Sequence, residues 1–64
     1  MVRYQLHEAA APHRRITVFE SNVDPHDAEA CVALLRTTAK QLRRKPAEVV
    51  LRFTGGKRPL EYRG

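Results

Sequence analysis

Apolar and polar residues alternate in two short segments in the first third of the chain. A period of two places every second side chain on the same face of a β-strand, which is typical of a sheet with one buried side. The pattern predicts one strand over residues 2–7 and a second over residues 14–20, with residues 8–12 in the connecting loop. The apolar residues that define the period are Val2, Tyr4, Leu6, Ile16 and Val18.

Antiparallel pairing of these two strands predicts which residues lie opposite each other. A hairpin that places Tyr4 opposite Ile16 also places Val2 opposite Val18, and it collects these apolar side chains on one face. Phe19 then points away from the predicted core. Phe19 is therefore either an exposed contact residue for a partner or a sign that the register differs.

A longer segment repeats its apolar residues at steps of three and four, which is typical of an α-helix that buries one face. Asp24 suits the N-cap of this helix, and Pro25 suits its first position because no backbone N–H is needed there. Pro46 disfavours helical geometry in the residue before it. We therefore expect a helix over Pro25–Arg44, about 30 Å long. Its apolar stripe consists of Ala28, Cys31, Val32, Leu35, Ala39 and Leu42.

The last third of the chain predicts a β-hairpin. The segment Glu48–Phe53 is rich in strand-forming residues, and Gly55-Gly56 supplies the positive φ angles of a tight turn. With these two glycines as the loop, Leu51 lies opposite Leu60. Pro59 cannot donate a ladder hydrogen bond, so the final strand is expected at an edge of the sheet.

Together these elements predict an α+β fold in the order β-β-α-β-β, with one long helix packed on a sheet of three or four strands. The chain has 64 residues, so residues 1–64 form a single small domain in this interpretation. A chain of this size buries only about 60% of the surface that its unfolded form exposes, so we expect a thin core. The single cysteine cannot form an internal disulfide.

The order of these elements resembles the β-grasp fold of ubiquitin-like proteins. The segment from Val50 to Glu61 is similar to that family's apolar strand, phenylalanine, small residue, glycine, lysine, leucine and acidic residue. The family's final central strand and its paired terminal glycines have no counterpart here, so no conjugation chemistry is implied. The resemblance implies protein–protein binding. It also implies that the first and third strands are parallel, or that another chain fills the gap between them.

Charge is distributed unevenly along the sequence. The net charge is +5, with three basic and five acidic residues in positions 1–35 but nine basic and two acidic residues in positions 36–64. Such a bias attracts phosphates, acidic proteins or anionic lipid head groups. Basic residues near a helix C-terminus also complement the helix dipole, so a merely solvated basic face is the competing interpretation. The expected nucleic-acid contacts are Arg36, Lys40, Arg43, Arg44, Lys45, Lys57 and Arg58.

Residue types that support catalysis or metal binding are present but not suitably arranged. The three histidines and the cysteine lack the spacing of a metal site. Cys31 lies on the apolar stripe and is expected to behave as a small buried hydrophobic residue. Ser21, Asp24 and His26 lie too close together in sequence for a catalytic triad. We therefore expect no enzyme activity, no cofactor and no metal.

The sequence thus predicts a small non-enzymatic basic module that binds nucleic-acid phosphates. The alternative is a protein-interaction module or regulator, of ubiquitin-like or phage type, that docks an acidic protein through a sheet edge, Phe19 or Leu34, alone or as a subunit of a larger complex. Formation of a homodimer is a further open alternative. No apolar run reaches the length of a membrane span and no signal-peptide pattern is visible, so we expect a cytoplasmic protein.

Overall fold

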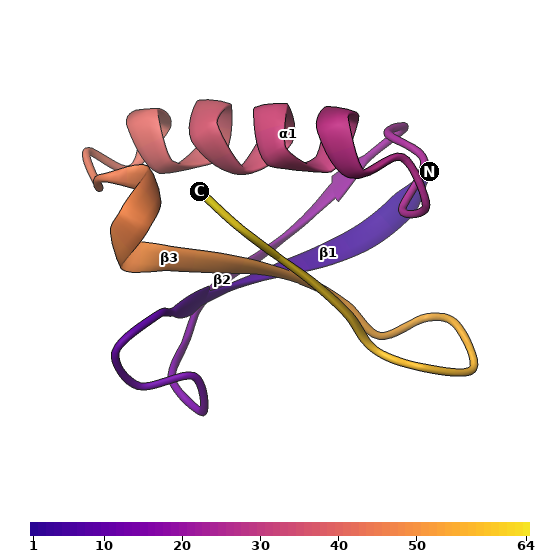
Figure 1. Ribbon diagram of the computed structural model, residues 1–64, viewed down its shortest axis with the longest axis horizontal. Helices are drawn as coiled ribbons and strands as arrows, with labels where there is room; N and C mark the ends of the chain where they lie inside the picture. Colours follow the sequence, from indigo (N-terminus) through magenta and orange to yellow (C-terminus); the bar gives the residue numbers. More distant parts are fainter.

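In the computed structural model, which describes residues 1–64, one α-helix lies across one face of a four-stranded antiparallel sheet (Figure 1). The predicted α+β class and the order β-β-α-β-β are confirmed. The elements are β1 (Val2–Glu8), β2 (Arg15–Ser21), α1 (Ala28–Gln41), the 3₁₀ turn η1 (Pro46–Glu48), β3 (Val49–Phe53) and β4 (Leu60–Arg63).

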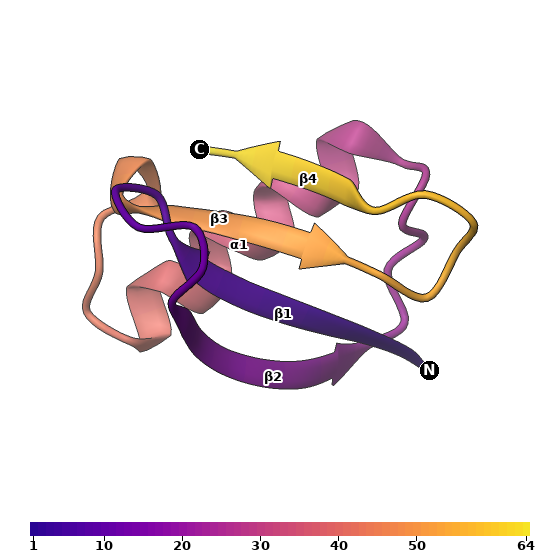
Figure 2. The same cartoon turned by 90° about the horizontal axis from the view of Figure 1, so that it is seen from below.

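The strand order in the sheet is β2-β1-β3-β4, and each neighbouring pair is antiparallel (Figure 2). β1 and β3 are direct neighbours, with Leu6 opposite Leu51. The expectation that the first and third strands are parallel or separated by a gap is therefore wrong. The reason is the helical crossover, which returns the chain parallel to β2 and hence antiparallel to β1. β2 and β4 form the two edges, as predicted for the last strand.

The register between β1 and β2 differs from the prediction. Tyr4 lies opposite Phe19 rather than Ile16, and Val2 lies opposite Ser21. The pairing skips Ile16, which forms a β-bulge, so both Ile16 and Phe19 pack against the core. The larger apolar area of a phenyl ring favours this arrangement, because it leaves only the smaller Val18 side chain exposed.

The helix begins later than predicted. Its N-cap is Asp27, whose Oδ1 accepts a hydrogen bond from the Ala30 backbone N–H at 3.1 Å. Asp24 instead stabilises the preceding turn, since its Oδ1 accepts from the His26 N–H at 2.9 Å and its carbonyl accepts from the Asp27 N–H at 3.1 Å. α1 has 14 residues, which corresponds to about 21 Å rather than about 30 Å.

The helix also ends earlier than predicted, in a Schellman motif. The Arg44 N–H donates to the Ala39 carbonyl at 2.8 Å, and the Arg43 N–H donates to the Lys40 carbonyl at 3.0 Å. Arg43 has φ 56° and is the one residue with a positive φ. This left-handed position after a helix usually carries glycine.

Substitution of Arg43 therefore gives a direct test of this helix end. Arg43→Gly is expected to be more stable than Arg43→Ala by about 1 kcal/mol, because only glycine adopts the left-handed conformation without a steric penalty. Both substitutions remove the same charge, so the difference isolates the backbone effect. Urea unfolding of the two variants measures it, and equal midpoints would contradict the Schellman geometry.

The core lies between α1 and the inner face of the sheet. Cys31, Leu35 and Ala39 of the predicted stripe are buried. Ala28 and Leu42 are exposed, whereas Leu34 and Thr38 are turned toward the protein because α1 packs on β3 and β4. The residues of the core cluster are Tyr4, Leu6, Cys31, Leu35, Ala39, Val49 and Leu51.

The predicted C-terminal hairpin is present, but its loop is longer. Phe53 pairs with Leu60, so residues 54–59 form the connection. Neither glycine has a positive φ, and the two-residue turn is therefore wrong. Gly55 lies against the Phe53 ring, where an added Cβ would come within 2.9 Å of Cε1. Close approach to the Phe53 ring, rather than a positive φ, favours glycine at position 55.

Candidate nucleic-acid interface

Four exposed basic side chains lie at the C-terminal end of α1 and in the turn after it, on the left of Figure 1. Arg36 and Lys40 are four residues apart and share one side of α1, whereas Arg43 and Lys45 lie in the turn after it. None of the four forms an ion pair within the chain. We call them the helix-end cluster, and its members are Arg36, Lys40, Arg43 and Lys45.

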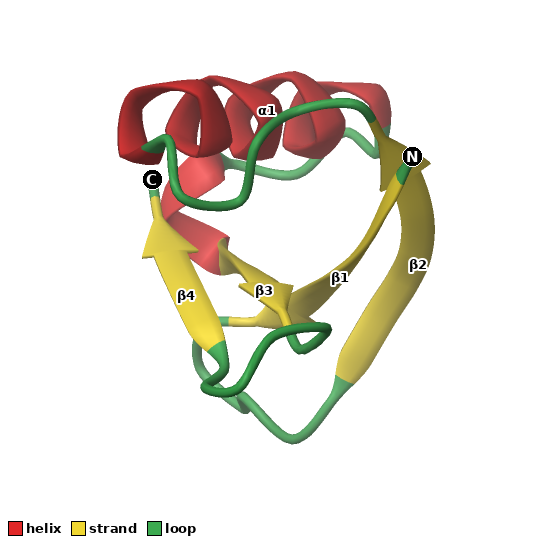
Figure 3. Cartoon of the chain, turned by 90° about the vertical axis from the view of Figure 1, so that its right-hand side faces the viewer, coloured by secondary structure: helices red, strands yellow, loops and turns green.

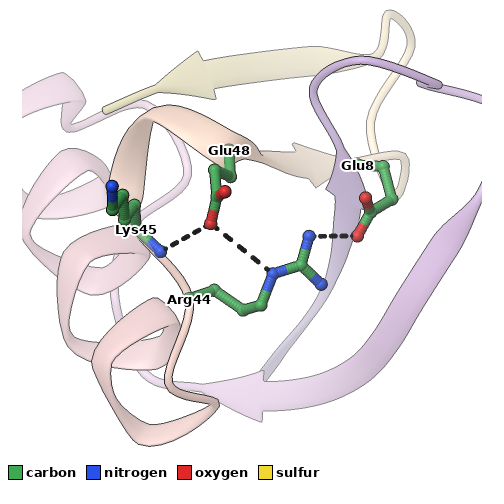
Figure 4. A network of polar contacts seen from close by, with 4 residues as sticks. All are labelled: Glu8, Arg44, Lys45 and Glu48. Carbon is green, nitrogen blue, oxygen red and sulfur yellow. Dashed lines mark hydrogen bonds and ion pairs between the residues drawn. The ribbon is translucent and has the colours of Figure 1, made fainter.

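Arg44 does not belong to this cluster, because it is engaged by two carboxylates (Figure 4). Its Nη2 pairs with Glu8 at the end of β1, and its Nε lies 3.8 Å from Oε1 of Glu48. The same Glu48 oxygen accepts a hydrogen bond from the Lys45 backbone N–H at 3.0 Å. The Schellman turn makes this possible, since it directs Arg44 toward the protein while Arg43 and Lys45 remain exposed.

Lys57 and Arg58 lie in the β3–β4 connection, at the end of the molecule opposite the C-terminus of α1 (Figures 1 and 2). They border a cleft of about 440 Å³ whose lining includes His26 and Phe53. Gly55 lies against the Phe53 ring, so this side of the ring is not available for stacking on a base. The seven basic residues expected to bind nucleic acid therefore do not form one surface.

The two expected partner contacts, Phe19 and Leu34, face inward. The Phe19 ring stacks on Tyr4, with centroids 5.9 Å apart and an interplanar angle of 25°. Leu34 is half-buried and packs against the core. The premise that these side chains leave the core is wrong, because it depended on the incorrect β1–β2 register and on a helix face turned away from Leu34. The exposed large aliphatic residues of the strands and the helix end are Val18 and Leu42, with 39% and 41% of their surface exposed.

Three side chains with ionisable groups hold the loop that leads into α1. The hydroxyl of Tyr4 donates to the Val23 carbonyl at 2.5 Å, and that of Tyr62 donates to the Pro25 carbonyl at 2.6 Å. The Cys31 thiol donates to the Asp24 carbonyl at 3.4 Å. Burial raises the pKa of Tyr4 to about 12, and burial also raises the pKa values of Cys31 and Tyr62. These groups are thus held neutral as structural donors, and the prediction of a buried Cys31 is confirmed.

The residues considered for a catalytic triad form hydrogen bonds with their neighbours in the sequence instead. Ser21 Oγ accepts from the Val23 N–H at 3.2 Å, and the Asp24 carboxylate accepts from His26. No three His, Cys, Asp or Glu side chains come together as a metal-binding group. α1 is neither long nor apolar enough to cross a membrane.

Comparison with known proteins identifies no relative of this chain. No family model, curated protein or solved structure matches it. The case for a function therefore depends on the chain's own geometry and charge.

Sequence reasoning missed a second group of arginines on the sheet face opposite α1. Each strand contributes one, because their positions alternate with the inward-facing residues. Arg52 in this group pairs with Glu61 at 2.6 Å. Alternation within each strand places every member on the outward face, and the strand order brings these members, from distant segments, onto one sheet. They are Arg3, Arg15, Arg52 and Arg63.

Proposed function

We propose that this protein is a non-enzymatic module that binds nucleic-acid phosphates through the helix-end cluster. The observation that carries the proposal is the combination of exposure and missing carboxylate partners at Arg36, Lys40, Arg43 and Lys45. A duplex carries one negative charge per about 1.7 Å of its axis, so four exposed basic side chains can meet several phosphates.

The helix dipole explains only part of this cluster. Its influence falls off within the last turn of a helix. Arg36 lies more than one turn before the end of α1 at Gln41, and Lys45 lies beyond the helix. Stabilisation of α1 therefore accounts for Lys40 and Arg43 but supplies no reason for the other two, whereas phosphate binding accounts for all four.

Salt dependence tests the proposal. The protein should bind a short duplex at low salt, with log affinity falling against log salt by a slope of about −3.6 if four phosphates are contacted. This slope corresponds to roughly a hundredfold loss between about 50 and about 200 mM salt. Fluorescence anisotropy with labelled duplex measures it, and absence of binding at the lowest salt would exclude this function.

Charge reversal at matched positions tests the location of the interface. Lys40→Glu/Arg43→Glu should weaken binding by more than about tenfold, because it removes two contacts and introduces repulsion. Lys57→Glu/Arg58→Glu makes the same change in net charge at the other end of the molecule and is the control. Equal losses in the two variants would mean that net charge, not the helix-end cluster, determines binding.

Two further measurements separate this function from its alternatives. Arg44→Gln should reduce affinity less than Lys40→Gln does, because Arg44 is already engaged by Glu8 and Glu48.

Competition with polyglutamate should be weak at equal charge concentration. If polyglutamate displaces the duplex as well as unlabelled duplex does, the cluster serves an acidic protein partner instead.

A further inference from the structure

The two edges of the sheet are protected to very different degrees. β4 is short, with four residues, and Pro59 immediately precedes it. α1 packs on β4. Gly64, which follows β4, lies close to Leu35 and Pro46, and a Cβ at Gly64 would lie 2.6 Å from the Pro46 Cβ. A short strand, a proline and a covering helix are the usual means by which an edge avoids pairing with another chain.

β2 has none of these three protections, although the bulge at Ile16 and the charged Arg15 and Glu20 restrict pairing toward its ends. It has seven residues, contains neither proline nor lysine, and forms the outer strand beside β1 (Figure 2). Figure 3 shows the outer edge of β2 free of any covering segment. A long edge with neither a proline nor a covering segment, and with the apolar Val18 at its middle, is a template for pairing with a further strand.

Burial along β2 is also incomplete on both of its faces. Tyr4 and Leu6 on β1 are fully buried, whereas the inward-facing Phe19 of β2 is only half-buried. On the opposite face, Val18 is 39% exposed. The strand thus presents apolar surface that this chain does not cover by itself.

The charges of β2 are complementary to a second copy of the same strand. If two β2 strands pair antiparallel about a two-fold axis at Val18, Thr17 lies opposite Phe19 of the other copy. The bulge at Ile16 then brings Arg15 opposite Glu20, and both of these side chains lie on the sheet face away from α1. Neither residue forms an ion pair within the chain.

We propose that two copies of this protein associate through their β2 edges to form one continuous eight-stranded sheet. The dimer places Val18 against its own copy and forms two symmetric Arg15–Glu20 ion pairs, as a two-fold interface requires. Seven residues span about 24 Å. We expect a single pair of strands of this length to bury less area than a standard interface, which covers about 800 Å² per partner. The dimer is therefore reversible and depends on concentration.

Analytical ultracentrifugation of the nucleic-acid-free protein over a range of concentrations tests the dimer. The wild type should show a monomer–dimer equilibrium. Val18→Lys should raise the dimer Kd by about tenfold or more, since it places like charges at the two-fold axis. Leu42→Lys is the matched control, because Leu42 is equally exposed but lies at the end of α1, and it should leave the Kd unchanged. A monomer at every concentration, or equal effects of both lysines, would overturn the proposal.

A charge swap provides a test that loss of folding cannot imitate. Arg15→Glu should weaken the dimer by repelling Glu20 of the other copy, and Arg15→Glu/Glu20→Arg should restore it. Restoration supports the proposed register, because the double variant has the wild-type composition of charge. Failure of the folded double variant to dimerise would exclude this register. The outcome is independent of nucleic-acid binding, which involves the helix-end cluster.

Discussion

Replacing Leu35 with alanine is expected to lower the free energy of unfolding by about 3 to 5 kcal/mol. Leu35 is fully buried in the core cluster between α1 and the sheet. The loss combines the transfer free energy of the removed methyl groups with the cost of the cavity. A chain of this length has a total stability of only about 3 to 10 kcal/mol, so the variant should be largely unfolded or melt at a much lower temperature. Urea and thermal unfolding followed by circular dichroism measure the effect.

Leu42→Ala is the matched control, with the same chemical change at the end of the same helix. Leu42 is 41% exposed, so its replacement should cost less than about 1 kcal/mol. The periodicity of the sequence placed both leucines in one buried stripe, and the two variants therefore separate the observed helix face from the predicted one. Similar losses at the two positions would mean that α1 does not bury Leu35 in preference to Leu42.

The element order could be predicted from the sequence because each element has its own local signal. The two-residue period of Val2, Tyr4 and Leu6 and the three- and four-residue steps of α1 are set by side chains that are close in sequence. The register of β1 and β2 could not be predicted in this way. It depends on whether Phe19 or Val18 is buried, and this choice is decided by packing against Tyr4.

The start of the helix was ambiguous for a related reason. Asp24 and Asp27 are both good N-caps, and Pro25 suits a first helical position. The structure selects Asp27 because the preceding loop is held by long-range hydrogen bonds from Tyr4 and Tyr62. These donors lie 19 and 37 residues from their acceptors, beyond the reach of any local pattern.

The candidate site was predicted in part. The bias of basic residues toward the second half of the chain predicted basic residues around the end of α1, and Arg36, Lys40, Arg43 and Lys45 are exposed there. Adjacency in sequence suggested that Arg43, Arg44 and Lys45 act together, but the left-handed Arg43 turns the chain so that Arg44 meets Glu8. An acidic partner 36 residues away could be identified only from the fold.

The helix-end cluster and the β2 edge are separate surfaces, and their proposed roles can combine. A dimer would carry two helix-end clusters on one assembly. If both can reach the same nucleic acid, the second contact forms at a high effective concentration, and the overall affinity exceeds that of one copy. Val18→Lys, which leaves every residue of the cluster intact, would then lower the apparent affinity for long duplexes but not for short ones.

Stability should decrease in alkaline solution as the buried tyrosine ionises. Burial raises the pKa of Tyr4 from 10.0 to about 12, because the fold accommodates the neutral hydroxyl that donates to the Val23 carbonyl. The contribution of the neutral Tyr4 hydroxyl to the free energy of unfolding is fully present below pH 10. It is lost as the pH rises through about 12, by roughly 2 to 3 kcal/mol for a pKa shift of this size. The raised pKa values of Cys31 and Tyr62 act in the same direction. Urea midpoints measured from pH 8 upward should therefore fall.

Tyr4→Phe identifies the source of this alkaline loss. At pH 8 the variant should be about 1 to 2 kcal/mol less stable than the wild type, because the Val23 carbonyl loses its donor. Its stability should then fall less steeply with pH, since the group with the largest shift has been removed, and the stability difference between the two proteins should disappear or reverse between pH 10 and pH 12. Parallel profiles for the wild type and the variant would mean that Tyr4 ionises no differently in the folded and unfolded chains. Equal stability of the two proteins at pH 8 would mean that the hydroxyl does not hold the loop into α1.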